Sequence, residues 1–342
     1  MKIHHLQSFL KNSKTNALCK RAPIWICKAC NYKCKFCYNK NSMQGFTRFE
    51  DMKGHIDELL EAGHTEIELT GGEPTIHPDF FKYCEYITER CGHVSCLSNG
   101  SKLANLDFAK RAKECGLNEV MFSVHSSIPE VYDDIVQHKC AFKKLIQGIK
   151  NCQTLGMRIR VNCTVNNENY AELPKEFYTL MNSLNPFEVN FILVNYWSDN
   201  STATFEPCKL KECTQAMKDF AALWNDKSLL NFRYVPMCYL KEFEKYVCDY
   251  PQLPFDVYDW SLCAYRRTFE KTKDIKNYTL KMYNSLETLK NQGTNFTYQY
   301  CENCSHKLLC DGMKQGMNTY ETFPYDGEEI HDTLYYRQGF YN

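Results

Sequence analysis

Cys30-Asn31-Tyr32-Lys33-Cys34-Lys35-Phe36-Cys37-Tyr38 is the stretch from which the rest of the chain can be interpreted. Its three thiols have the spacing C-x3-C-x2-C, and an aromatic residue stands on each side of the third. Thiolates bind iron–sulfur clusters, and four of them complete the ligand set of a [4Fe–4S] cluster. Three thiolates therefore leave one iron open to a small molecule. A zinc knuckle is the alternative, but zinc sites usually use paired C-x2-C units or histidine partners.

Alternating strand-like and helix-like segments begin at about residue 23, which predicts a parallel sheet with helical crossovers. Six such units end near residue 195, so we expect an α/β fold with a partial (β/α)6 TIM-like barrel. Active sites in such sheets lie beyond the carboxyl ends of the strands. The expected strands are 24–26, 66–70, 93–97, 119–124, 158–165 and 189–194, and the expected helices are 49–63, 80–90, 108–115, 142–155 and 173–184.

A glycine-rich turn, Gly71-Gly72-Glu73-Pro74, directly follows the second expected strand. Glycine lets a main chain approach a ligand where a side chain would clash. Alone, this turn is a weak signal. Together with the cysteine triplet and the predicted topology, it resembles the signature of the radical S-adenosylmethionine (SAM) enzymes, and the expected fold is then a partial barrel of the radical SAM type.

The resemblance implies a set of cofactor contacts. Cys30, Cys34 and Cys37 would hold a [4Fe–4S] cluster whose fourth iron takes the amino and carboxylate groups of SAM. Phe36 would lie against the adenine, and Glu73 would help to bind the methionine amino group. Loop packing and strand-end capping are the alternatives for the non-cysteine positions. The full set of expected SAM contacts is Phe36, Tyr38, Gly71, Gly72, Glu73, Ser98, Asn99, Ser123 and Asn162.

Two positions depart from the family pattern. Many relatives carry Asp two residues after the serine of the fourth strand, where this chain has His125. They often carry Arg about ten residues further on, where this chain has Ile135-Val136-Gln137. These departures leave the ribose and carboxylate contacts open, and His125 becomes a candidate substrate contact.

A second cysteine group, Cys301-x2-Cys304-x5-Cys310-x-Gly312, resembles part of the SPASM/Twitch extension of radical SAM enzymes. This implies one auxiliary [4Fe–4S] cluster, with Cys301, Cys304 and Cys310 as ligands. Because no cysteine follows Cys310, the fourth ligand must come from upstream or the position stays open for substrate. Cys238 is the first choice because Pro236 fixes the backbone beside it; Cys263 and then Cys248 follow. A zinc site is the alternative.

Length and composition indicate the class of protein and its domain organisation. The chain has 342 residues, of which 20 are cysteines, and its 41 basic residues balance 41 acidic ones. This balance gives no support for nucleic-acid or membrane binding. The N-terminus has no apolar signal segment, so we expect a reducing cytoplasm. We expect an N-terminal extension at 1–22, the radical SAM barrel at 23–200 and a Twitch/SPASM-like domain at 201–342.

Cysteines without ligand spacing should pack as small apolar residues. These are Cys19, Cys27, Cys84, Cys91, Cys96, Cys115, Cys140, Cys152, Cys163, Cys208 and Cys213.

The resemblance also implies a reaction. An external donor such as flavodoxin or ferredoxin would reduce the first cluster, SAM would be cleaved, and a 5′-deoxyadenosyl radical would take a hydrogen atom from substrate. Relatives with this C-terminal pattern often modify ribosomally made peptides, which is our first expectation for the substrate, although an extension of about 22 residues is short for a peptide-recognition domain. Dehydrogenation or epimerisation of a sugar or aminocyclitol is the second. A non-catalytic iron–sulfur or zinc scaffold is the third.

Overall fold

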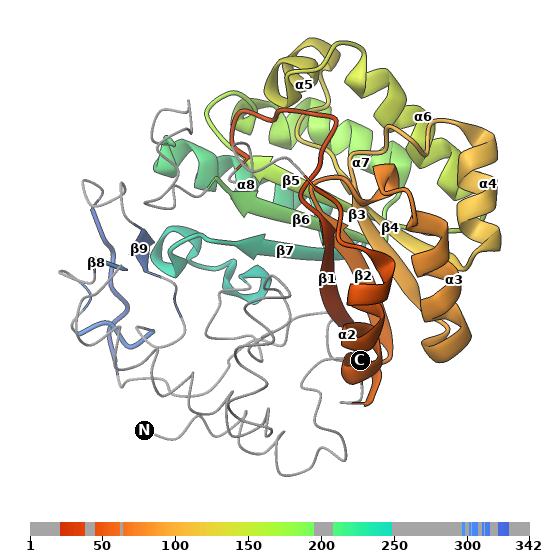
Figure 1. The fold of residues 1–342 in the computed structure, drawn as a ribbon. Helices are drawn as coiled ribbons and strands as arrows, with labels where there is room; N and C mark the ends of the chain where they lie inside the picture. Colours follow the sequence, from red (N-terminus) through yellow and green to blue (C-terminus); the bar gives the residue numbers. More distant parts are fainter. Residues whose placement is uncertain are drawn as a thin grey trace.

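The computed structural model describes residues 21–37, 45–61, 64–194, 208–247, 296–297, 301, 303–306, 310, 312–314 and 321–327. Its centre is a sheet of seven parallel strands that pair in sequence order from β1 to β7 (Figure 1). The strands are β1 (Arg21–Cys27), β2 (Glu66–Gly71), β3 (Val94–Ser98), β4 (Leu117–Ser123), β5 (Arg158–Val165), β6 (Glu188–Leu193) and β7 (Leu229–Arg233).

Helices cover one face of this sheet and leave the other face concave (Figure 1). They are α2 (Phe49–Glu61), α3 (Phe80–Cys91), α4 (Leu106–Glu114), α5 (Pro129–Val136), α6 (Ala141–Thr154), the π-helical turn η4 (Leu173–Phe177), α7 (Tyr178–Leu184) and α8 (Leu210–Trp224). Apolar side chains recur on one side of each amphipathic helix, and burying that side against the sheet is what fixes the helix in place.

Aromatic side chains pack the last helix, α8, against the sheet. Phe220 of α8 meets Phe191 of β6 edge-to-face, with ring centroids 4.8 Å apart, and lies near Phe177. Phe191 in turn lies beside Phe232 of β7. Since these rings are fully buried, the intervening residues of β6 and β7 must face the concave side of the sheet.

Charged side chains fill the concave side near the start of the strands. Arg160 of β5 donates to Glu188 of β6 at 2.5 Å, and to Glu119 of β4 and Glu68 of β2 at 3.1 Å each. A bond from β5 to β2 crosses the interior of the curved sheet. The concave side of the sheet therefore carries a layer of ion pairs near the amino ends of the strands. The candidate site lies at the opposite, carboxyl ends of the strands.

The predicted α/β partial barrel is confirmed, with additions. A seventh strand, β7, continues the sheet beyond residue 200, where the sequence placed the start of the second domain; that division stays a prediction. The periodicity missed α5, which is only two turns long and begins with Pro129 in its first turn. The helix expected at 173–184 begins as the wider turn η4 before α7.

Most cysteines predicted to pack are buried: Cys27, Cys84, Cys96, Cys115, Cys152, Cys163, Cys208 and Cys213. Cys140 is exposed, so that prediction is wrong; it stands just before α6, in a left-handed conformation. Cys19 and the side chain of Cys91 lie outside the described residues.

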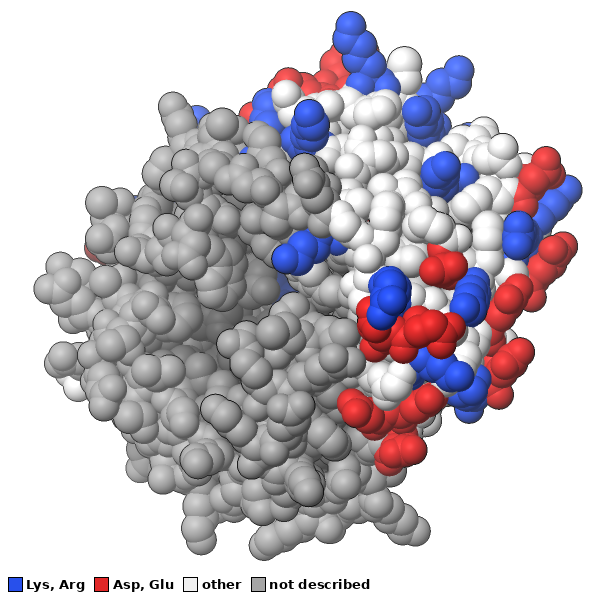
Figure 2. Space-filling view, in the orientation of Figure 1, with Lys and Arg blue, Asp and Glu red and all other residues white. Residues whose placement is uncertain are grey.

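Two surface features follow. Basic and acidic side chains are interspersed over the described surface on the face shown in Figure 2. No helix among the described residues is both long and apolar enough to cross a membrane.

Candidate functional site

The first cysteine group lies in a loop that leaves the carboxyl end of β1, and main-chain bonds tie the loop to the turn after β2. Gly72 N donates to Cys27 O, and Glu73 N donates to Ala29 O, both at 2.9 Å. The strand ladder therefore continues for two further contacts past the strands themselves. This extension places the Gly-Gly-Glu-Pro turn beside the cysteine loop, as the sequence predicted.

The far side of the loop is held by α5. Lys33 N donates to Val136 O at 3.2 Å, and Lys35 N donates to Ile135 O at 2.9 Å. The Lys35 ammonium group also pairs with Asp134 and, at 2.8 Å, with Glu168. Carbonyl groups at a helix C-terminus have no partner within the helix, so the loop amides satisfy them. The stretch that departs from the family pattern thus serves here as a main-chain anchor for the cysteine loop.

The three thiols of the loop lie near one another and are partly withdrawn from water. Burial raises the pKa of the Cys30 thiol to about 12, although the Tyr32 amide donates to its sulfur at 3.4 Å. Burial also raises the pKa of Cys34, and the neighbouring thiols of Cys37 and Cys30 add to that effect. Such thiols need a metal to be stable as thiolates, so the donor set fits the iron–sulfur cluster that the sequence predicts.

The two glycines of the turn are required by the chain itself. A Cβ at Gly71 would lie 2.1 Å from Cys27 O, and a Cβ at Gly72 would lie 2.1 Å from Ala29 O. Gly71 also has a φ of +135°, which L side chains rarely adopt. The sequence attributed these glycines to close approach of the cofactor. The structure shows close approach of the cysteine loop at both positions, and the cofactor contact stays a prediction.

Glu73 is buried and joins the ends of β2 and β3. Its Oε1 accepts from the hydroxyl of Ser98 at 2.8 Å and from both the amide and the hydroxyl of Thr75; its Oε2 accepts from Asn99 N at 2.7 Å. The Asn99 side chain then donates to Asn31 in the cysteine loop at 2.9 Å. Burial raises the pKa of Glu73, against the lowering effect of these donors. Three predicted site residues are thus brought together, and Asn31 is a partner that sequence reasoning missed.

His125 is a packing residue in this structure, contrary to the substrate contact considered from the sequence. Its Nδ1 accepts from Thr164 N at 3.1 Å, and its ring meets Phe36 edge-to-face at 4.7 Å. Burial lowers the pKa of His125 to about 3, which makes it neutral at ordinary pH. Phe36 is thereby fixed within the cysteine loop.

The remaining predicted SAM contacts lie on the concave side. Ser123 of β4 pairs in register with Asn162 of β5, and both are partly exposed. They lie above the ionic layer at the carboxyl half of their strands, where a ligand can reach them. Tyr38 lies outside the described residues.

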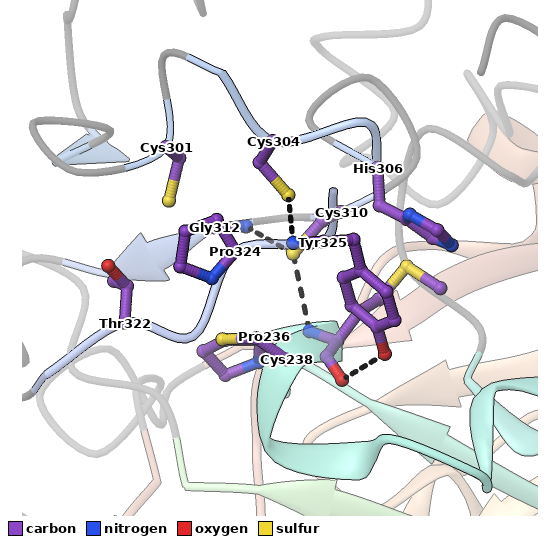
Figure 3. Close-up of a pocket in the computed structure, with 11 residues that line it drawn as sticks. Pro236, Cys238, Cys301, Cys304, His306, Cys310, Gly312, Thr322, Pro324 and Tyr325 are labelled. Carbon is purple, nitrogen blue, oxygen red and sulfur yellow. Dashed lines mark hydrogen bonds between the residues drawn. The ribbon is translucent and has the colours of Figure 1, made fainter. Parts of the chain in front are cut away.

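The second cysteine group forms a separate pocket on the β7 side of the sheet. Figure 3 shows the sulfurs of Cys238, Cys301, Cys304 and Cys310 pointing into one pocket. Cys238 comes from the short helix η5 (Met237–Leu240), five residues after β7 ends. Burial raises the pKa of Cys238, and Cys304 adds to the effect. Cys238 therefore lines the same pocket as the other three cysteines, and its role as a cluster ligand stays a prediction. Cys263 and Cys248 lie outside the described residues.

Other side chains close the pocket. The Tyr325 ring stacks on His306 with centroids 3.9 Å apart, and its hydroxyl donates to Glu244 at 2.6 Å. Among the described residues, no three His, Cys, Asp or Glu side chains converge closely enough to hold one metal ion. The four thiols line the same pocket.

Known proteins match this combination of fold and cysteine loop. The family model described as the radical SAM superfamily matches residues 26–176. Residues 26–176 thus form a radical SAM domain, a family that implies SAM and a [4Fe–4S] cluster as cofactors.

Individual relatives are more distant. The chain is 30% identical over 217 residues to an Fe-coproporphyrin III synthase of Methanosarcina barkeri, covering 62% of this chain and 52% of that protein. It is 26% identical over 147 residues to a GTP 3′,8-cyclase of Aliarcobacter butzleri, covering 41% and 45%. The chain thus spans about half the length of the curated relatives it matches.

Solved structures confirm the fold. Methylornithine synthase (PylB) matches with a TM-score of 0.53 at 16% identity, over 80% of this chain and 83% of that one. SuiB of Streptococcus suis matches with a TM-score of 0.53 at 14% identity, over 66% and 51%. At these identities the likeness concerns the fold alone.

Proposed function

We propose that this protein cleaves SAM reductively at a cluster held by Cys30, Cys34 and Cys37, and that it carries an auxiliary [4Fe–4S] cluster on Cys238, Cys301, Cys304 and Cys310. The observation that supports this most directly is the presence of two separate thiol groups, one at the carboxyl end of β1 and one just beyond β7. When bound, the first cluster and SAM supply the 5′-deoxyadenosyl radical that abstracts hydrogen from substrate.

The chain's own residues position these groups. The anchors at Gly72, Glu73 and α5 hold the cysteine loop rigid, which keeps three thiolates in one geometry. Ser123 and Asn162 offer polar contacts to SAM from the concave face. Oε2 of Glu73 has one protein donor among the described residues, and a carboxylate oxygen can accept two bonds, so it retains capacity for the methionine amino group if a path opens to it.

The auxiliary site supports a closed ligand set. Four cysteines complete the coordination of a [4Fe–4S] cluster, which leaves no iron open for substrate. Cys238 follows the carboxyl end of β7, which supports a site near the carboxyl ends of the strands. The proposed domain for it starts near residue 201, with β7 and η5 linking it to the barrel.

The substrate proposal follows the C-terminal resemblance: a ribosomally made peptide, as in many enzymes with this cysteine pattern. A small molecule is the second candidate. It is favoured by the curated relatives, which are named for Fe-coproporphyrin III and for GTP. The external electron donor would be a flavodoxin or ferredoxin, and the proposed location is a reducing cytoplasm.

The direct test is SAM cleavage. Anaerobically reconstituted protein, reduced with dithionite, should form 5′-deoxyadenosine and methionine, measured by liquid chromatography. Cys34→Ala should abolish this, because it removes one of three ligands of the first cluster. Cys152→Ala is the matched control, since Cys152 is also buried but has no proposed ligand role. A fully iron-loaded wild type that forms no 5′-deoxyadenosine would instead favour the scaffold function.

A further inference from the structure

The four thiols of the auxiliary pocket differ in their main-chain surroundings. Cys310 Sγ accepts from two amides, Gly312 N at 3.2 Å and Met237 N at 3.3 Å (Figure 3). Cys304 Sγ accepts from one, Tyr325 N at 3.3 Å. These amides come from three separate segments of the chain. The Phe323 amide also hydrogen-bonds to Cys238, which counteracts the rise in its pKa that burial causes. Cys310 accepts from two amides that lie far apart in the sequence.

Backbone geometry aims both donors at Cys310. Met237 is the first residue of η5, and the first amides of a helix have no partner within it. Pro236 precedes it in an extended conformation, with φ −59° and ψ 125°. Gly312 has a φ of +71°, a left-handed value that favours glycine. Tyr325 lies beside this segment: its hydroxyl, which donates to Glu244, is 3.2 Å from Met237 O.

Hydrogen bonds to ligand sulfurs tune the reduction potential of iron–sulfur clusters. An N–H donor stabilises negative charge on the sulfur, and the reduced cluster carries more of that charge. Two donors on one thiolate therefore raise the potential. We propose that the Met237 and Gly312 amides, acting through Cys310, set the potential of the auxiliary cluster and make it more oxidising. This rests on the auxiliary cluster of the proposed function.

Met237→Pro removes one donor with little backbone change, because proline lacks the N–H and is favoured in the first turn of a helix. The residue before a proline prefers an extended conformation, which Pro236 already has. Met237 itself is buried, so Met237→Ala is the control: it loses the same side chain but keeps the amide. The measurement is the midpoint potential of the auxiliary cluster, followed by electron paramagnetic resonance during a redox titration.

We expect the potential of Met237→Pro to be more negative than that of Met237→Ala, and that of Met237→Ala to match the wild type. Equal potentials in the two variants would overturn the proposal. A wild-type protein that binds only about four irons would instead overturn the auxiliary cluster itself, so the two failures are distinguishable.

A second pair tests the other donor. Gly312→Val disfavours the left-handed backbone that aims this amide, whereas Gly312→Asn tolerates it; the two side chains are similar in size. Gly312→Val should shift the potential in the same negative direction, and Gly312→Asn should stay closer to the wild type. Met237→Pro and Gly312→Val could bind no second cluster while both controls do. This result would show that the two amides are needed for Cys310 to hold the cluster. Equal effects in Val and Asn would contradict the role of Gly312.

Discussion

At the scale of single residues, the buried polar groups of the site serve mainly to position the chain. Glu73 accepts from Thr75, Ser98 and Asn99, so its removal would leave several buried donors without partners, each at a cost of about 1–3 kcal/mol. Its sequence motif predicted a cofactor contact. The structure adds that this carboxylate first joins the ends of β2 and β3 to the cysteine loop.

His125 gives a pH prediction. Its pKa is about 3 in the folded chain and about 6.5 when unfolded, so the unfolded chain binds one more proton between these values. The free energy of unfolding should then fall as pH drops below about 6.5. In His125→Asn, the amide oxygen can still accept from Thr164 N. The slope should be smaller there, by an amount that grows to about 1.4 kcal/mol per pH unit near pH 5.

Urea unfolding of both proteins between pH 5 and 6.5 checks this. The comparison uses slopes because the asparagine also loses the ring contact with Phe36, which lowers stability equally at every pH. Identical slopes would show that His125 takes up its proton in the folded state as well.

At the scale of elements, the decisive contact is the close approach of the cysteine loop to the turn after β2. Gly72→Ala would place a Cβ 2.1 Å from Ala29 O, and the overpacked main chain should lose about 1–3 kcal/mol of stability. Because the loop must move, the protein should also bind less iron at the first site.

Gly54→Ala in α2 is the matched control. A Cβ there meets nothing within 4 Å, and alanine is favoured over glycine inside an exposed helix by about 1 kcal/mol. This variant should be slightly more stable and fully loaded, as judged by thermal unfolding and iron content. A Gly72→Ala protein that retains wild-type iron content and stability would contradict the proposed packing.

At the scale of the whole molecule, the sequence predicted what depends on local pattern. Strand and helix periodicity placed the six strands from β1 to β6, and cysteine spacing placed both thiol groups. It missed α5, which is too short to show a period, and β7, which follows a stretch assigned to another domain. Contacts between distant segments, such as Met237 N with Cys310 or Asn31 with Asn99, leave no local signal. Only the fold reveals them.

The sequence predicted Cys238 as the fourth ligand from a count of cysteines. Its position beside Cys301, Cys304 and Cys310 follows from the path of the chain after β7. Cys238 follows β7 by five residues, so it lies within about 18 Å of the end of that strand. The two proposed cofactor sites therefore follow the first and the last strand of one parallel sheet. The width of this sheet limits the distance between them.

The most direct test of a two-cluster enzyme is the iron content of the anaerobically reconstituted protein. We predict about eight irons per chain in the wild type, from two four-iron clusters. Replacing Cys30, Cys34 and Cys37 by Ala should leave about four, and so should replacing Cys301, Cys304 and Cys310. A wild-type protein with about four irons and one tightly bound zinc would contradict the account.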